Sequence, residues 1–279
     1  MMAWAKEFKE NTVLRWNGVY KFQPKISLNI ESGSYILKTA DTYEELIESC
    51  RLRHEVFFQE FQDIEFSGID VDRFDTHFDH LIIIHRSTNK IIGTYRLNCS
   101  TFSNLSYTQQ EFNLTEIYKL EGPHIELGRA CIQKDHRKSA SVISLLWRGI
   151  TEYMNISEAK VLFGCSSIKI SNPRDAALVF KFLLEQGSVL TDSFANPTKK
   201  FQITDFDLYL SQLQNGLTQT QTEEASRLIP PLLKAYLKFG AKIGGEPAFD
   251  KEFNCIDVLT VMKKHEITNS LARRFQVVQ

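Results

Sequence analysis

Apolar side chains recur at helical spacing in four stretches of the chain. Asp41, with Glu44 three positions later, opens the first stretch in a pattern typical of a capped helix start. In a later stretch, Asn172 and Pro173 supply a cap and a first-turn proline, and Pro230 precedes the last one. The spacing predicts helices over residues 42–58, 139–153, 172–186 and 231–239.

Short apolar or alternating runs predict the strands. Residues 87–90 are polar and separate two such runs, as expected for a hairpin. Residues 102–122 look like a loop with a short helix, and residues 188–216 look irregular. The predicted strands cover residues 81–84, 91–97, 125–133, 161–165 and 256–262. Strands and helices in this order favour an α/β fold, in which a mixed sheet carries helices on both faces.

The chain has 279 residues, of which 43% are hydrophobic, so it can bury a large core. We expect an N-terminal extension over residues 1–40, one domain over residues 41–265 with an insertion at about 188–225, and a C-terminal tail over 266–279. The extension carries Trp4, Phe8 and Trp16 among basic residues. It either packs on the domain or lies on an acidic lipid surface, and both alternatives stay open.

Charge and cysteine content exclude several classes of protein. Lys and Arg together number 33 against 34 Asp and Glu, which argues against an evenly basic surface built for nucleic acid. The five cysteines are far apart and form no Cys-x-x-Cys pair, so we expect a reducing cytosol and no disulfide framework. No apolar run approaches the roughly 20 residues of a membrane span, and residues 1–30 lack the apolar core of a signal peptide.

Four motifs occur along the chain in a specific order. They are Arg-Leu-Arg-His-Glu-Val-Phe at 51–57, Asp-Val-Asp-Arg-Phe-Asp at 70–75, Gly-Thr-Tyr-Arg-Leu at 93–97 and Glu-Leu-Gly-Arg at 126–129. Further matches at 145–150, 163–166 and 231–241 extend the pattern. In this joint order the chain resembles the GNAT superfamily, and within it the ornithine N-acyltransferases and their hemolysin-like relatives, which are similar to acyl-homoserine-lactone synthases. The resemblance implies a mixed, mostly antiparallel central sheet.

This resemblance also implies an activity. It is the transfer of a long acyl group, often 3-hydroxyacyl, from acyl carrier protein to the α-amine of ornithine or a similar amino acid, giving a lyso-ornithine-type lipid precursor. Acyl carrier protein and the amino acid are then the partners, no further cofactor is expected, and the chain is cytoplasmic with optional peripheral contact at the inner membrane. The alternatives are an acyl-homoserine-lactone-like signal synthase, which would be shorter, and a non-catalytic module that binds lipid or carrier protein.

Glu126 is the candidate proton acceptor. An α-amine with a pKa near 7.7 to 8.0 is only about one-tenth neutral at pH 7, and only the neutral amine attacks a thioester. A carboxylate on a strand between Ile125 and Leu127 is suited to remove that proton. Arg129 is the expected positioning partner of Glu126, and the alternative is a purely structural salt bridge between the two.

Donor binding is predicted where the helix from Ser139 begins. Unpaired amides at a helix N-terminus, together with Arg137 and Lys138, form a potential anion site for a pantetheine phosphate. Residues 136–141 lack the glycine-rich loop of acetyl-CoA-dependent enzymes in this superfamily, which favours a carrier-protein donor. A solvated basic surface is the alternative of equal weight.

A group of charged residues has three alternative roles, namely contact with a cationic amino acid, internal pairing of arginines with aspartates, or metal binding. Its members, taken as candidate substrate-binding residues, are Arg51, Arg53, Asp70, Asp72, Asp75 and Arg96. Internal pairing is the first choice. We expect no metal, because the segment lacks a calcium-loop glycine and His77 and His80 have no third zinc ligand nearby. Cys131 and Cys165 are expected to be buried, inert thiols.

Overall fold

The computed structural model describes residues 19–62, 65, 68–191 and 195–264, and the chain divides into two compact units. The first unit contains the described residues up to Leu105 together with Leu127–Ala159. The second contains Ser106–Glu126 and the described residues from Lys160 onward. Because strand β5 (His124–Ile132) passes from one unit into the other, it contributes to both.

In the sheet of the first unit, the first four strands pair antiparallel with their neighbours. Its strands are β1 (Asn29–Ser32), β2 (Tyr35–Thr39), β3 (Asp79–His85) and β4 (Lys90–Cys99), followed by β5. The predicted hairpin of β3 and β4 is confirmed. Strands β1 and β2 lie in the stretch predicted to be an extension, and Gly33 makes their tight turn at a φ of +55°.

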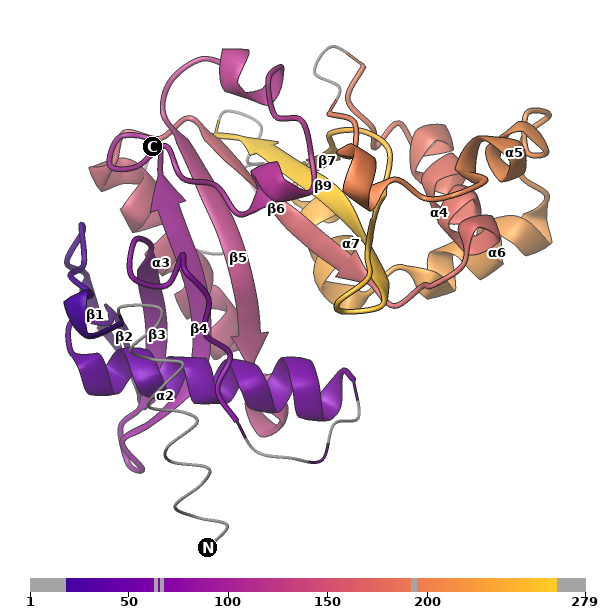
Figure 1. Ribbon diagram of the computed structural model, residues 1–279. Helices are drawn as coiled ribbons and strands as arrows, with labels where there is room; N and C mark the ends of the chain where they lie inside the picture. Colours follow the sequence, from indigo (N-terminus) through magenta and orange to yellow (C-terminus); the bar gives the residue numbers. More distant parts are fainter. Residues whose placement is uncertain (1–18, 63–64, 66–67, 192–194, 265–279) are drawn as a thin grey trace, which may run out of the picture. The chain divides into compact units, whose positions relative to one another are not determined.

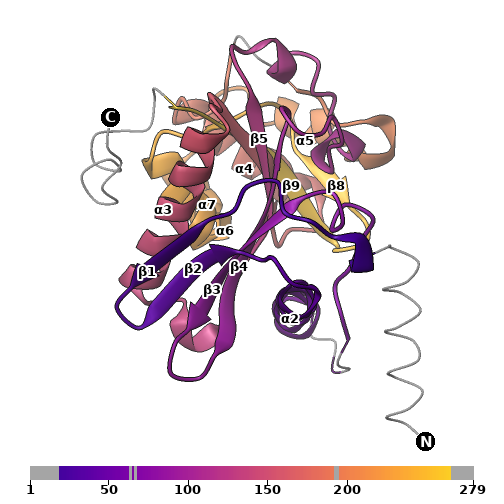
Figure 2. The ribbon, with the colours of Figure 1, turned by 90° about the vertical axis from the view of Figure 1, so that its left-hand side faces the viewer.

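Two long helices cover opposite faces of this sheet, as Figure 2 shows for α2 (Tyr43–His54) and α3 (Ala140–Ile156). A π-helical turn, Glu55–Glu60, extends α2. On one face, Cys50 and its helical neighbours pack on Ile82 of β3. On the other, Gly149 lets α3 approach β2 so closely that a Cβ there would lie 2.6 Å from the Leu37 side chain.

The caps of these helices test the predicted starts. Ser139, predicted as the first residue of a helix, is the N-cap of α3, and its side chain accepts a hydrogen bond from the Val142 amide. The prediction for α2 was wrong by one position. Thr42, not Asp41, is the N-cap, and its hydroxyl accepts from the Glu45 amide.

The second unit is built on β6 and β9, which run antiparallel and side by side (Figure 1). The beginning of β5 pairs with β6 in parallel over three residue pairs, and β7 and β8 both pair with β9. The bounds are β6 (Val161–Ile168), β7 (Lys242–Ile243), β8 (Ala248–Asp250) and β9 (Cys255–Lys263). The sheet is therefore mixed and mostly antiparallel, as the family resemblance implies.

The described residues of the second unit form four α-helices, namely α4 (Pro173–Glu185), α5 (Phe206–Ser211), α6 (Gln219–Leu228) and α7 (Pro231–Lys238). Single 3-10 turns occur at Val19–Lys21, Thr108–Gln110, Ile117–Lys119, Lys134–His136 and Lys199–Phe201. In the part of the chain that the structure describes, no helix combines the length and apolar character that crossing a membrane requires.

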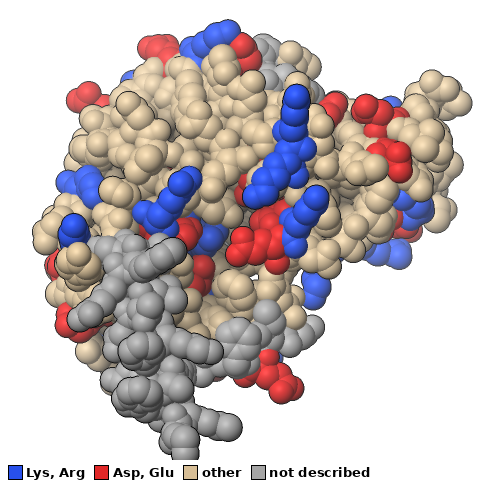
Figure 3. Space-filling model, viewed as in Figure 1, with Lys and Arg blue, Asp and Glu red and all other residues tan. Residues whose placement is uncertain are grey.

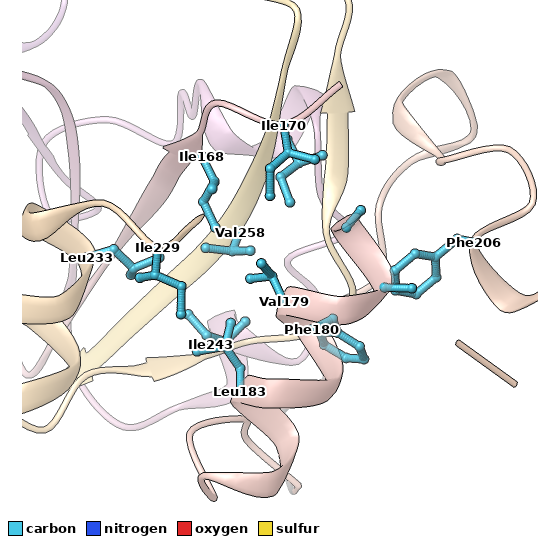
Figure 4. Packing of buried hydrophobic residues seen from close by; sticks show 13 residues of the cluster. Ile168, Ile170, Val179, Phe180, Leu183, Phe206, Ile229, Leu233, Ile243 and Val258 are labelled. Atoms are coloured by element: carbon cyan, nitrogen blue, oxygen red, sulfur yellow. The ribbon is translucent and has the colours of Figure 1, made fainter. Parts of the chain in front are cut away.

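Alternate residues of β9 supply two apolar clusters of the second unit. Val258 packs in a cluster with Val179 of α4 and Phe206 of α5 (Figure 4). Leu259, its neighbour in sequence, packs in the other cluster with Phe112. The stretch predicted to be irregular therefore contains a helix, α5, that is held by a buried aromatic side chain.

Candidate active site

Glu126 lies near the start of β5, where the flanking Ile125 is fully buried. Its side chain is 4% exposed. Oε1 accepts hydrogen bonds from the Thr108 amide and the Thr108 hydroxyl, both at 2.7 Å, and Oε2 accepts one from the Tyr107 amide at 3.2 Å. Three donors on two consecutive residues hold the carboxylate in one orientation, as a positioned proton acceptor requires.

The donors come from a tight turn that the sequence places in the predicted loop 102–122. Thr108 begins a 3-10 turn, and the Ser106 hydroxyl accepts from the Gln109 amide on the same turn. The Thr108 side chain is itself buried. The turn therefore directs its amides and one hydroxyl at Glu126, a role for Thr108 that the sequence analysis missed.

A second group of charged residues forms a buried ionic network in the first unit. Arg53 is completely buried and donates from Nε to Asp70 Oδ2 at 2.7 Å. Its two terminal nitrogens donate to the two oxygens of Asp75 at 2.7 and 3.1 Å. This fork geometry is the strongest form of arginine–carboxylate pairing. It agrees with internal pairing of arginines with aspartates, the role that the sequence favoured among the three alternatives.

Two further arginines complete the network. Arg96 donates from Nη1 to Asp72 at 2.7 Å and to Asp75 at 2.9 Å. Arg129 donates to Asp70 at 3.1 Å and to Asp72 at 3.2 Å. Asp72 and Arg129 are its partly exposed members, with side chains 23% and 14% exposed. They are the most exposed members of the network.

Arg129 has an unusual backbone. Its φ is +50°, although it is a non-glycine residue inside a strand. Such a conformation is rare away from turns and often marks a functional position. The two ion pairs of Arg129 hold its side chain in place. Its predicted role as the positioning partner of Glu126 stays a prediction.

The charges of the network set the protonation of its members. Burial opposes ionisation of Asp75, but the guanidinium groups of Arg53 and Arg96 hold its pKa well below the ordinary value. Burial also lowers the pKa of His80 to about 4. The imidazole is therefore neutral at pH 7, and its Nε2 contacts the Asp75 carbonyl oxygen at 3.0 Å.

Arg51 lies outside this ionic network. It is exposed and pairs with Glu48 on its own helix at 2.9 Å. The structure therefore brings Arg53, Asp70, Asp72, Asp75 and Arg96 together with Arg129, whereas Arg51 belongs to the helix surface.

The predicted donor-binding residues lie around the start of α3. Arg137 makes a two-pronged ion pair with Glu60 at 2.7 and 2.8 Å and donates from Nε to the Ile132 carbonyl oxygen. Lys138 is exposed, and Ser139 is the helix cap. Binding of an acyl donor at these residues stays a prediction. Figure 3 shows basic side chains beside acidic ones on the displayed face rather than a field of one sign.

A buried carboxyl cluster in the second unit was not predicted. Oxygen atoms of Glu111, Asp250 and Asp257 all lie within 4.8 Å of one another, a set that could hold a metal ion, and all three residues are buried. The only sequence signal was an acidic residue inside an otherwise apolar strand, at Asp257. The expectation of no metal stays a prediction.

Cys165 lies beside this carboxyl cluster. Burial, with the negative charge of neighbouring acids, raises the pKa of its thiol well above the ordinary value, so the reactive thiolate is not formed at neutral pH. We expect Cys165→Ala to retain turnover within about tenfold of wild type, because losing a covalent nucleophile typically costs more than about 10⁴. The rate and the intact mass after mixing with a thioester donor check this. An acyl group trapped on Cys165 would contradict direct transfer.

The chain was compared with a protein-family model, with known sequences and with solved structures. The model of the acetyltransferase (GNAT) domain matches residues 52–148. The chain is 29% identical to an L-ornithine N(alpha)-acyltransferase of Brucella abortus, over 85% of this chain and 87% of that protein. It is 28% identical to one of Rhodobacter capsulatus, over 82% and 90%. Among solved structures, TofI in a ternary complex with an inhibitor and MTA matches with a TM-score of 0.45 and 12% identity, over 88% of this chain and 98% of that one. The chain is therefore similar to L-ornithine N(alpha)-acyltransferases over most of its length, and its residues 52–148 match the GNAT acetyltransferase domain, which supports an acyltransferase activity.

Proposed function

We propose that the chain transfers a long-chain acyl group, of the 3-hydroxyacyl type, from acyl carrier protein to the α-amine of ornithine or a similar amino acid. The product would be a lyso-aminolipid precursor. One observation carries this proposal. The similarity to L-ornithine N(alpha)-acyltransferases covers 85% of the chain, and so continues far beyond the GNAT domain match at residues 52–148.

The proposed chemistry is direct attack of the amine on the thioester. The nitrogen forms a bond to the thioester carbonyl carbon, the carbon–sulfur bond breaks, and the carrier sulfur leaves as a thiolate. Glu126 accepts the proton that the amine loses, directly or through water, a contribution of about 10² to 10⁴ in rate. Its three hydrogen bonds from Tyr107 and Thr108 support this role, because they keep the carboxylate in place during the reaction.

Recognition of the amino acid is proposed at the exposed edge of the ionic network. Asp72 offers a carboxylate for an ammonium group, and Arg129 offers a guanidinium for a carboxylate. Arg53 and Asp75 are fully buried, so we assign them to holding this edge rather than to touching the substrate.

The donor is proposed to bind at the start of α3. The amides there and the exposed Lys138 suit a pantetheine phosphate. Arg137 is already paired with Glu60 and would contribute through that pair or by exchanging it for the phosphate.

The test is a direct assay with matched donors. The purified chain is mixed with ornithine and either 3-hydroxyacyl carrier protein, the acyl-CoA of the same chain length, or acetyl-CoA. We expect acyl-ornithine, detected by mass spectrometry, from the carrier-protein donor at the highest rate. A preference for acetyl-CoA would contradict the donor, and a preference for another amine would replace ornithine.

The two alternatives give other results. A lactone product would indicate a signal synthase. No product with any donor or amine, together with tight binding of the carrier protein, would indicate a non-catalytic binding module. Lipid mass spectrometry of a heterologous host that expresses the chain gives an independent reading of both substrates.

A further inference from the structure

Tyr118 packs against the neighbours of Glu126 in the second unit. It lies in the 3-10 turn Ile117–Lys119 and is 39% exposed. Its ring meets the ring of His124 edge-on, with centroids 5.9 Å apart, and that of Phe163 in the same way at 6.0 Å. His124 precedes Glu126 by two positions on β5, and Phe163 is the partner of Glu126 on β6. Because alternate residues of a strand and paired residues of neighbouring strands share a face, Tyr118 and Glu126 lie on the same side of the sheet.

The Tyr118 hydroxyl reaches the turn that holds Glu126. It is hydrogen-bonded to the side chain of Ser106, which is itself buried. The Ser106 hydroxyl accepts from the Gln109 amide at 3.1 Å, so it belongs to the same turn as the Thr108 donors. Burial raises the pKa of the Tyr118 hydroxyl above its ordinary value, so at neutral pH this group keeps its proton and adds no charge beside Glu126.

The backbone of Tyr118 is fixed by the strands on which its ring rests. Its neighbour Ile117 is fully buried in an apolar cluster that includes Phe163. The Ile117 backbone is also hydrogen-bonded to the His124 side chain, and burial lowers the pKa of that imidazole. The start of β5 and the adjoining part of β6 therefore set the position of Tyr118, and its side chain extends from there to Ser106.

We infer that Tyr118 is a positioning residue for Glu126. Its side chain fastens the turn at Ser106–Thr108 to the strands that carry and flank Glu126, so the donors of the turn and the carboxylate keep one relative position. A turn that drifts would weaken the three hydrogen bonds and move the carboxylate, and a displacement of about 1 Å can cost on the order of 10² in rate. The effect on turnover rests on the proposed function, whereas the effect on the turn does not.

Hydrogen exchange of the turn, measured by NMR, tests this connection without a substrate. Tyr118→Phe removes the hydroxyl and keeps the ring. We expect the Tyr107 and Thr108 amides to exchange about three- to tenfold faster in this variant, because losing one hydrogen bond favours local opening by about that factor. The control is Tyr43→Phe, the same change at a tyrosine of similar exposure on α2, which should leave both amides as in wild type. Unchanged exchange of both amides in Tyr118→Phe would overturn the inference.

The consequence for catalysis is measured with ornithine and 3-hydroxyacyl carrier protein. Tyr118→Phe should lower kcat about three- to tenfold and leave both KM values within about twofold of wild type, because it disturbs the proton acceptor and not the binding groups. In a Glu126→Gln background the same change should cost no further activity, since the turn then has no base to position. An unchanged kcat, a change in KM alone, or equal losses in both backgrounds would overturn the positioning role.

Ser106→Ala tests the route by which Tyr118 acts. This change removes the partner of the Tyr118 hydroxyl, so adding Tyr118→Phe to it should lower kcat no further. Fully additive losses would show that Tyr118 does not act through Ser106 and would overturn the inference. A chain without acyl-ornithine activity would instead fail the proposed function, and the exchange rates of the Tyr107 and Thr108 amides would still decide whether Tyr118 fixes the turn.

Discussion

Glu126→Gln is expected to lower turnover by about 10² to 10⁴ while the fold is retained, because an amide cannot accept the amine proton. The substitution keeps the size of the side chain and an oxygen that can still accept from the Thr108 amide and hydroxyl. Its new NH₂ group faces the Tyr107 amide, so we also expect a loss of about 1 kcal/mol in stability. Steady-state kinetics and thermal unfolding measure the two effects.

The control is Glu121→Gln, the same change at an exposed glutamate before β5, which should leave kinetics unchanged. The pH dependence gives a second reading. If Glu126 removes the amine proton, the variant Glu126→Gln depends on amine that is already neutral in solution. Its rate should therefore rise by up to about tenfold per pH unit until the pH reaches the pKa of the amine, because the neutral fraction of the amine grows by that factor. Wild-type kinetics in Glu126→Gln would exclude Glu126 from the mechanism.

The elements that the sequence predicted well have strong periodic patterns. The β3–β4 hairpin and α4 combine apolar positions with clear turn or cap signals, and local structure follows them. The β1 strand, by contrast, has mostly exposed residues, and its place in the sheet comes from pairing with β2. Helix α5 is only six residues long, too short to show a period, and depends on the packing of Phe206.

Some residues of the candidate site could be predicted from the sequence, and others could not. Charged motifs drew attention to Asp70, Asp75 and Arg96, and a network of alternating charges is their natural arrangement. Glu111 could not be found from the sequence, because its environment comes from Asp250 and Asp257, which lie far along the chain. Helical phase could have separated Arg53 from Arg51, since Arg53 follows the buried Cys50 by three positions and so shares its face.

The difference in burial between Arg53 and Arg51 leads to the largest expected effect on stability. Arg53→Met should lower the free energy of unfolding by about 3 to 5 kcal/mol, because it leaves the buried carboxylates Asp70 and Asp75 without their shared guanidinium. Arg51→Met removes only an exposed pair with Glu48 and should cost about 0 to 1 kcal/mol. Urea unfolding followed by circular dichroism at neutral pH compares the two variants. Equal losses would contradict the burial argument.

Acid should reduce the difference between wild type and Arg53→Met. Burial alone would raise the pKa values of Asp70 and Asp75 in the folded chain. The neighbouring arginines outweigh this effect, so both pKa values are lowered. The stabilisation from a carboxylate with a lowered pKa is fully present above the unfolded pKa of about 3.9 and is lost as pH falls through the folded pKa. In Arg53→Met the same acids can take up protons at higher pH, which relieves their unpaired charge. The gap between the two unfolding free energies is therefore expected to be full near pH 7 and to narrow as pH falls toward and below about 4.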